Sequence, residues 1–220
     1  MALDGYTSPD FDRSALVTID VQRDVLDGGP LEIAGTSAFL PRLGALARGF
    51  RSAGRPIVHM VRLYQSDGHD VDLSRRARFD AGRPTLLAGS PGAELAPGIA
   101  EAGTDALDTV RLLEGLPQQL GPDEVVIFKP RWGAFFRTSL AEHLEMLGVN
   151  TLAFAGANFP NCPRTSIYEA SERDYRLVVA SDAVSGLYQR GSVELEGIGA
   201  ALMTCGEIVG ALVPESGPGG

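Results

Sequence analysis

The sequence predicts an α/β fold built on a mostly parallel, six-stranded sheet. Short apolar runs rich in Val, Ile and Leu recur along the chain, and amphipathic segments of helical length separate most of them. Gly or Pro stands at many of the junctions. Strands that are apolar on both faces are typical of a parallel sheet covered by helices on each side. We therefore expect a Rossmann-like, three-layer α/β/α arrangement.

Six apolar runs are expected to form the strands. They cover residues 14–21, 56–62, 124–128, 151–155, 176–180 and 207–213. Capping residues and helical spacing predict helices over 36–53, from 138 or 139 to 147, over 162–172 and over 192–204, with a short one inside 107–120. Residues 1–13 are expected to form a surface arm and residues 214–220 a flexible tail.

Residues 63–122 make one long connection between expected strands, and its first part is polar and charged. A connection of this length in a compact domain usually has a function, such as covering a site. A surface insertion without such a role is the alternative, and we favour a lid or a subunit interface. We expect one domain over residues 1–220.

Composition excludes several classes of protein. The 220 residues are 44% hydrophobic and 21% charged, which is typical of a globular domain. A formal net charge of −9 argues against non-specific nucleic-acid binding and against an anionic membrane surface. No apolar run approaches the length of a membrane span, and the acidic N-terminus is not typical of a secretory signal. Two cysteines make no disulfide framework, so we expect a cytoplasmic location.

Cys162 lies where the strand expected at 151–155 gives way to a helix. Gly156 permits a sharp turn, and Pro163 is favoured at the first position of a helix. The partial positive charge of a helix N-terminus favours the thiolate, which is the reactive form of cysteine. By position alone, a small buried hydrophobic side chain is an equally good interpretation.

Two more reactive side chains, Asp20 and Lys129, stand at the carboxyl ends of other expected strands. These ends converge on one edge of a doubly wound sheet, so we expect Asp20, Lys129 and Cys162 to meet. Asp20 can take the thiol proton and later give it to a leaving amine. A nearby ammonium group lowers the pKa of a carboxyl and of a thiol, so Lys129 is expected to favour both anions. Backbone amides around Cys162 offer an oxyanion hole, and His59 is a weaker candidate base.

Four motifs carry a family resemblance. LVTIDVQRD contributes Asp20 and Gln22, and FKPRWGAFFRTSL contributes Lys129. AGANFPNC places a glycine six residues before Cys162, and VVASDAVSG contributes Asp182. In order and spacing these motifs resemble the isochorismatase-like cysteine hydrolase superfamily, which includes nicotinamidases and N-carbamoylsarcosine amidohydrolases.

The resemblance covers roughly residues 14–190 and implies an Asp20–Lys129–Cys162 triad with an acyl-enzyme on the cysteine. It also implies a cis peptide bond, expected at Ala157–Asn158, and an oxyanion hole formed by the amides of Asn158 and Cys162. The implied activity is hydrolysis of an amide or ureide C–N bond of a small molecule, without a cofactor. A homodimer or homotetramer is implied as well.

The chain departs from the nicotinamidase branch after the second strand. RLYQSDGHDVD holds a single histidine there instead of a cluster of metal ligands, so we expect no catalytic metal. Val25 replaces a frequent aromatic residue of the pocket wall. The residues expected to bind substrate are Gln22, Arg62, Trp132, Phe136 and Phe159.

Competing interpretations remain for several of these residues. The aromatic side chains can belong to the core, and Arg62 can form a surface salt bridge in place of a contact with a substrate carboxylate or carbonyl. Arg75 and its arginine neighbours can assist from the lid or from another subunit. Two other functions also fit the motifs: a vinyl-ether hydrolase that uses Asp20 as its acid, and an inactive, ligand-binding member. A Cys162–Cys205 redox pair is weak, because nothing in the sequence places the two within bonding reach.

Overall fold

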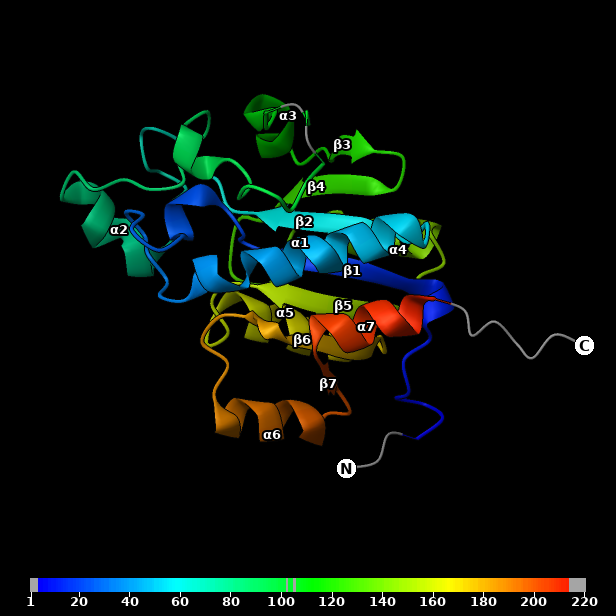
Figure 1. Ribbon diagram of the computed structural model, residues 1–220. Helices are drawn as coiled ribbons and strands as arrows, with labels where there is room; N and C mark the ends of the chain where they lie inside the picture. Colours follow the sequence, from blue (N-terminus) through cyan, green and yellow to red (C-terminus); the bar gives the residue numbers. More distant parts are fainter. Residues whose placement is uncertain (1–3, 102, 105, 214–220) are drawn as a thin grey trace, which may run out of the picture.

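A single mixed sheet forms the centre of the structure, a computed structural model that describes residues 4–101, 103, 104 and 106–213 (Figure 1). Its strand order is β3-β4-β2-β1-β5-β6-β7. All neighbouring strands are parallel except β3 and β4. The strands are β1 Ser14–Ile19, β2 Ile57–Val61, β3 Gln118–Gly121, β4 Glu124–Phe128, β5 Thr151–Gly156, β6 Arg176–Val184 and β7 Ala201–Met203.

Helices cover both faces of the sheet. They are α1 Thr36–Ser52, α2 Leu73–Asp80, α3 Thr109–Leu113, α4 Leu140–Met146, α5 Cys162–Ser171, α6 Gln189–Gly197 and α7 Cys205–Leu212, with 3-10 turns η1 Phe11–Arg13, η2 Arg23–Val25 and η3 Pro91–Ala93. One core joins the sheet to α4 and α5, and a second joins it to α1 and α7 on the opposite face (Figure 1). The predicted three-layer α/β/α class is confirmed.

The central strands are buried along their whole length, which is why their sequences show continuous apolar runs. The expected strands at 14–21, 56–62, 124–128, 151–155 and 176–180 are all present, each within a few residues of its predicted bounds. Helices α1, α4 and α5 also lie where capping and spacing predict them.

The C-terminal prediction is wrong, and the sheet has seven described strands where we expected six. Residues 207–213 form most of α7, and the strand lies at 201–203, inside the segment expected to be helical. A capping box starts α7, because Thr204 accepts a hydrogen bond from the Glu207 amide and the Glu207 carboxylate accepts one from the Thr204 amide. Ile208 and Leu212, four residues apart, are then buried together on one face of the helix. A short apolar run fits a helix face as well as a strand.

The long connection at 63–122 has secondary structure of its own. It contains α2, η3, α3 and β3, and β3 pairs with β4 in an antiparallel hairpin that the sequence did not reveal. Part of the expected surface arm, residues 4–13, is held against the sheet through Asp10, which accepts a hydrogen bond from Asn150 at 3.1 Å. Residues 1–3 of that arm and the expected tail at 214–220 lie outside the described residues.

Within the described ranges, none of the helices has the length and apolar character that crossing a bilayer requires. The expected cytoplasmic location stays a prediction.

Candidate active site

The carboxyl ends of the central strands stand level with one another. In the strand register, Ile19 pairs with Met60 and with Gly156, and Val61 pairs with Phe128. Asp20, Arg62 and Lys129 therefore follow β1, β2 and β4 at one edge of the sheet. This is the edge at which open α/β sheets bind ligands.

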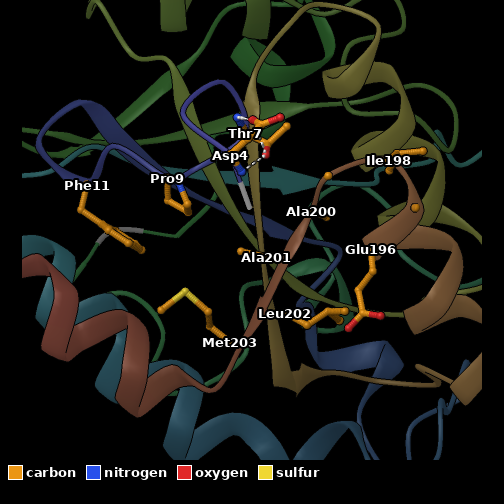
Figure 2. Close-up of a pocket in the computed structure, with 12 residues that line it drawn as sticks. Asp4, Thr7, Pro9, Phe11, Glu196, Ile198, Ala200, Ala201, Leu202 and Met203 are labelled. Carbon is orange, nitrogen blue, oxygen red and sulfur yellow. Dashed lines mark hydrogen bonds between the residues drawn. The ribbon is translucent and has the colours of Figure 1, made fainter. Parts of the chain in front are cut away.

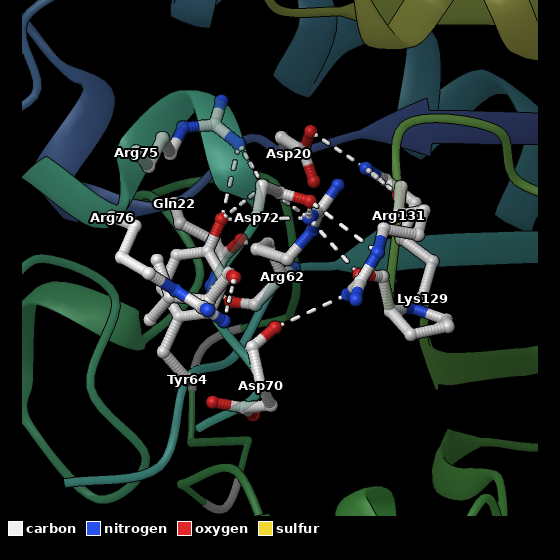
Figure 3. A network of polar contacts seen from close by, with 12 residues as sticks. Asp20, Gln22, Arg62, Tyr64, Asp70, Asp72, Arg75, Arg76, Lys129 and Arg131 are labelled. Atoms are coloured by element: carbon white, nitrogen blue, oxygen red, sulfur yellow. Dashed lines mark hydrogen bonds and ion pairs between the residues drawn. The ribbon is translucent and has the colours of Figure 1, made fainter. Parts of the chain in front are cut away.

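Asp20 and Lys129 form a buried ion pair. Lys129 Nζ donates to Asp20 Oδ2 at 2.8 Å, and the lysine is 0% and the aspartate 6% exposed (Figure 3). Asp20 Oδ1 has no hydrogen-bond partner among the described residues. The lysine thus fixes one carboxylate oxygen and leaves the other able to exchange a proton. Lys129 is also the only lysine in the sequence.

Cys162 is the first residue of α5, is 2% exposed, and lines the same cavity as Asp20. Burial raises the pKa of its thiol to about 11, and the neighbouring Asp20 carboxylate adds to the increase. Lys129 and Arg62 lower this pKa, but their effect is smaller. Of the two interpretations that the position of Cys162 allowed, burial favours the small buried side chain in the resting protein, against the effect of the helix N-terminus. The thiol is neutral at pH 7 and needs a base to become a nucleophile.

The turn before Cys162 is tightly constrained. Gly156 has φ of 126°, and a Cβ at this position would collide with the backbone oxygen of Ile19. The Ala157–Asn158 peptide bond is cis, as the resemblance implied. The amides of Asn158 and Cys162 donate no hydrogen bond to another described residue, and both residues line the cavity. They are available to a developing oxyanion.

The cavity at this edge has a volume of about 160 Å³. Its wall is formed by Asp20, Val25, Leu31, Glu32, Ile33, Arg62, Arg75, Leu86, Ala157, Asn158, Asn161 and Cys162. Arg75 and Leu86 come from the long connection, so this segment contributes to the cavity wall, while its role as a lid or a subunit interface stays a prediction. Sequence reasoning missed Leu31, Ile33 and Leu86, whose apolar character within polar loops was the available signal.

Four residues expected to bind substrate lie outside this cavity. Gln22 is fully buried and braces Arg62, because its side chain accepts from the Arg62 amide at 2.9 Å and donates to the Arg62 carbonyl oxygen at 2.9 Å. Phe159 packs in the core beside α5, Trp132 packs against that core, and Phe136 is exposed. The apolar wall comes instead from the loop after β1 and from Leu86.

His59 and Cys205 take no part in the site. His59 is buried between Thr18 Oγ1 and Glu124 Oε1, each 2.7 Å from a ring nitrogen, so it is a satisfied core residue. Cys205 belongs to the core on the α1 and α7 side, whereas Cys162 belongs to the core on the other face. Among the residues that the structure describes, no cluster of three or more His, Cys, Asp or Glu side chains could hold a metal ion.

A larger hollow of about 700 Å³ lies beside the edge strand β7, between this strand and the N-terminal arm (Figure 2). Its wall includes Asp4, Phe11, Glu196 and Met203. It contains neither a cysteine nor a carboxylate paired with a lysine. We therefore take the smaller cavity as the candidate active site.

Comparison with known proteins identifies the family. The isochorismatase domain model matches residues 14–110 and 109–196. The chain belongs to the isochorismatase family. An isochorismatase family protein of known structure, from Desulfovibrio vulgaris, is 29% identical with a TM-score of 0.76, over 91% of this chain and 98% of that one.

Two relatives of the chain differ in the activity that their names state. The "Probable inactive nicotinamidase" of Arabidopsis thaliana is 28% identical over 79% of this chain and 81% of its own length. The "Ureidoacrylate amidohydrolase RutB" of Methylorubrum extorquens is 28% identical over 79% of this chain and 70% of its own length.

Proposed function

We propose that this isochorismatase-family protein is a cysteine amidohydrolase that cleaves an amide or ureide C–N bond of a small molecule. The observation that carries the proposal is the free Oδ1 of Asp20, held in the Cys162 cavity by the buried pair with Lys129. A neutral thiol beside an oriented carboxylate is the arrangement that general-base activation requires.

In the first half of the reaction, Asp20 takes the thiol proton as the Cys162 sulfur attacks the carbonyl carbon. The amides of Asn158 and Cys162 stabilise the negative oxygen of the tetrahedral intermediate. Asp20 then gives its proton to the substrate nitrogen, the C–N bond breaks, and ammonia or an amine leaves. The acyl group remains on Cys162 as a thioester.

In the second half, Asp20 removes a proton from a water molecule, whose oxygen attacks the thioester carbon. The C–S bond breaks and the sulfur recovers the proton from Asp20. The products are a carboxylic or carbamic acid and the free enzyme. Lys129 keeps its contact with Asp20 Oδ2 throughout, so Oδ1 carries the proton in both halves.

A relative named as a ureidoacrylate amidohydrolase supports the choice of C–N hydrolysis. The nicotinamidase relative is named as inactive, so family membership alone does not establish turnover. Here the proposal rests on Asp20, Lys129 and Cys162 being present together.

The test is release of ammonia or amine from a panel of small amides and ureides by the wild type, Cys162→Ala and Cys162→Ser. We expect both variants to lose at least about 10³-fold in kcat/KM. Cys205→Ala is the matched control, because it removes the other buried thiol, and it should keep activity within a few-fold. Mass spectrometry should detect the acyl-enzyme on Cys162.

Full activity in Cys162→Ala would refute the covalent mechanism. Retained hydrolysis of a vinyl ether by that variant would indicate the ether hydrolase that uses Asp20 as acid. Ligand binding without any turnover in the wild type would indicate an inactive, ligand-binding member.

A further inference from the structure

Arg62 is the most buried charged group of the cavity wall. It is 1% exposed, and Gln22 holds its backbone on both sides. Its Nη1 donates to Asp72 Oδ1 at 2.9 Å, to Asp72 Oδ2 at 2.8 Å and to the Pro130 carbonyl oxygen at 3.2 Å. The guanidinium therefore has a fixed orientation.

The other two nitrogens of the Arg62 guanidinium are free to bind a ligand. Nε and Nη2 are buried and have no hydrogen-bond partner among the described residues. They lie along one edge of the guanidinium, and this edge is the fork that matches the two oxygens of a carboxylate. Buried donors rarely stay unpaired in proteins, since leaving them without an acceptor is costly.

This pair of nitrogens belongs to the same cavity as the proposed nucleophile. Arg62 lines the cavity with Asp20 and Cys162. Figure 3 shows its guanidinium in the midst of the polar network, near both Asp72 and Asp20. A ligand bound to Nε and Nη2 would therefore lie in the same small space as the sulfur.

The excess of positive charge around Asp72 also favours an anionic ligand. Three arginines surround this one carboxylate: Arg62, Arg75 with Nη1 at 2.7 Å, and Arg131 with Nε at 3.8 Å. Lys129 is already paired with Asp20. Arg75 also lines the cavity, so the wall carries more positive charge than Asp72 compensates. Glu32 lies at the exposed rim, where solvent screens its charge.

We propose that the substrate is an anion: a short amide or ureide that also carries a carboxylate. Nε and Nη2 of Arg62 bind the carboxylate as a fork, and Arg75 attracts it, while the scissile carbonyl meets Cys162. A cavity of about 160 Å³ restricts the substrate to a few carbon atoms between the two groups. This inference rests on the proposed hydrolase function and specifies its substrate class.

The alternative role for Arg62 is purely structural, as an anchor for Asp72 at the start of α2. Under that alternative, a negative charge on the substrate brings no advantage. The test therefore compares molecules that differ only in that charge. The monoamides of malonic, succinic and glutaric acids are measured against the corresponding diamides, which present the same carboxamide to the sulfur.

For at least one chain length, we expect kcat/KM of the wild type to favour the monoamide acid by roughly 10- to 100-fold. Arg62→Gln and Arg62→Lys should remove most of this preference, since lysine keeps the charge but not the fork. Arg75→Gln should raise KM for the acid more than it lowers kcat. Arg190→Gln, an exposed arginine on α6, removes the same charge elsewhere and should leave the preference intact.

Binding separates this inference from the hydrolase proposal. Calorimetry with Cys162→Ala should find the acid bound at least about tenfold more tightly than its diamide, and Cys162→Ala with Arg75→Gln should bind the acid more weakly. Equal binding of acid and diamide at all three lengths would overturn the inference even if both are hydrolysed. Selective binding of the acid without turnover in the wild type would leave the anion site standing and refute the hydrolase. If Arg62→Gln does not fold, the wild-type comparison and Arg75→Gln still decide.

Discussion

The Asp20–Lys129 pair predicts a large and specific loss of stability when only its lysine is removed. Lys129→Met keeps the length and the apolar stem of the side chain but leaves the Asp20 carboxylate buried without its partner. Removing one member of a buried ion pair typically costs about 3–5 kcal/mol, because a charge stays in the interior uncompensated. For a chain of this size, each kcal/mol lowers Tm by about 2–4 °C, so we expect a fall of about 6–20 °C.

The double variant Asp20→Asn with Lys129→Met separates the pair from the packing around it. Replacing both charges with neutral groups of similar shape removes the uncompensated charge, so the double variant should recover most of the lost stability. Arg13→Met is the matched control. Arg13 Nε lies 2.8 Å from Asp10 Oδ2, the same separation as in the buried pair, but its side chain is 61% exposed. That substitution should cost less than about 1 kcal/mol.

The assay is urea denaturation of the four proteins followed by circular dichroism, with thermal melts in parallel. A cost below about 1 kcal/mol for Lys129→Met would refute the reasoning. So would a double variant no more stable than the single one, because the loss would then come from packing and not from charge.

Four further predictions follow from individual residues. The pKa of Cys162 is raised to about 11, so the rate of its alkylation by iodoacetamide should increase about tenfold per pH unit from pH 7 to 10. Mass spectrometry measures this rate, and a rate that levels off below pH 8 would contradict the prediction. Burial alone would raise the pKa of Glu124, but Arg51 and His59 lower it to about 2 from 4.5. This carboxylate therefore stabilises the fold above pH 4.5, and its contribution is lost as the pH falls toward 2. The shift corresponds to about 3 kcal/mol, and Glu124→Gln should flatten the urea stability profile across that window; an unchanged profile would contradict the assignment. Gly156→Ala should destabilise the protein by more than about 1 kcal/mol in the same assay, because its φ of 126° and the Ile19 backbone exclude a Cβ, and a neutral effect would show that the turn adapts. We also propose that the protein forms a homodimer or homotetramer, which sedimentation analysis would detect, and a monomer at micromolar concentration would contradict it.

The sequence predicted the part of the site that follows from sheet topology. Asp20 and Lys129 were placed correctly because they directly follow apolar strands, and parallel strands bring such positions to one edge. Cys162 was placed by the glycine and proline on either side of the turn.

The remaining features depend on information that local patterns do not contain. The raised pKa of Cys162 comes from burial by residues distant in the sequence, whereas a helix N-terminus is a local signal. Phe159 is three residues from Cys162, yet its ring packs in the core, since a turn can direct a side chain to either side. The run 207–213 fits a strand or a helix by pattern, and its packing against α1 made it a helix.

The single lysine of the sequence is a site at which this protein can be modified selectively. Every other Lys or Arg position of the chain is an arginine, so reagents that acetylate or crosslink amines have one side-chain target, Lys129. The Lys129 side chain is fully buried. An amide formed at that nitrogen in the folded protein therefore requires the reagent to pass the cavity wall. The rate of such acylation, counted by mass, would report how often this edge of the sheet opens.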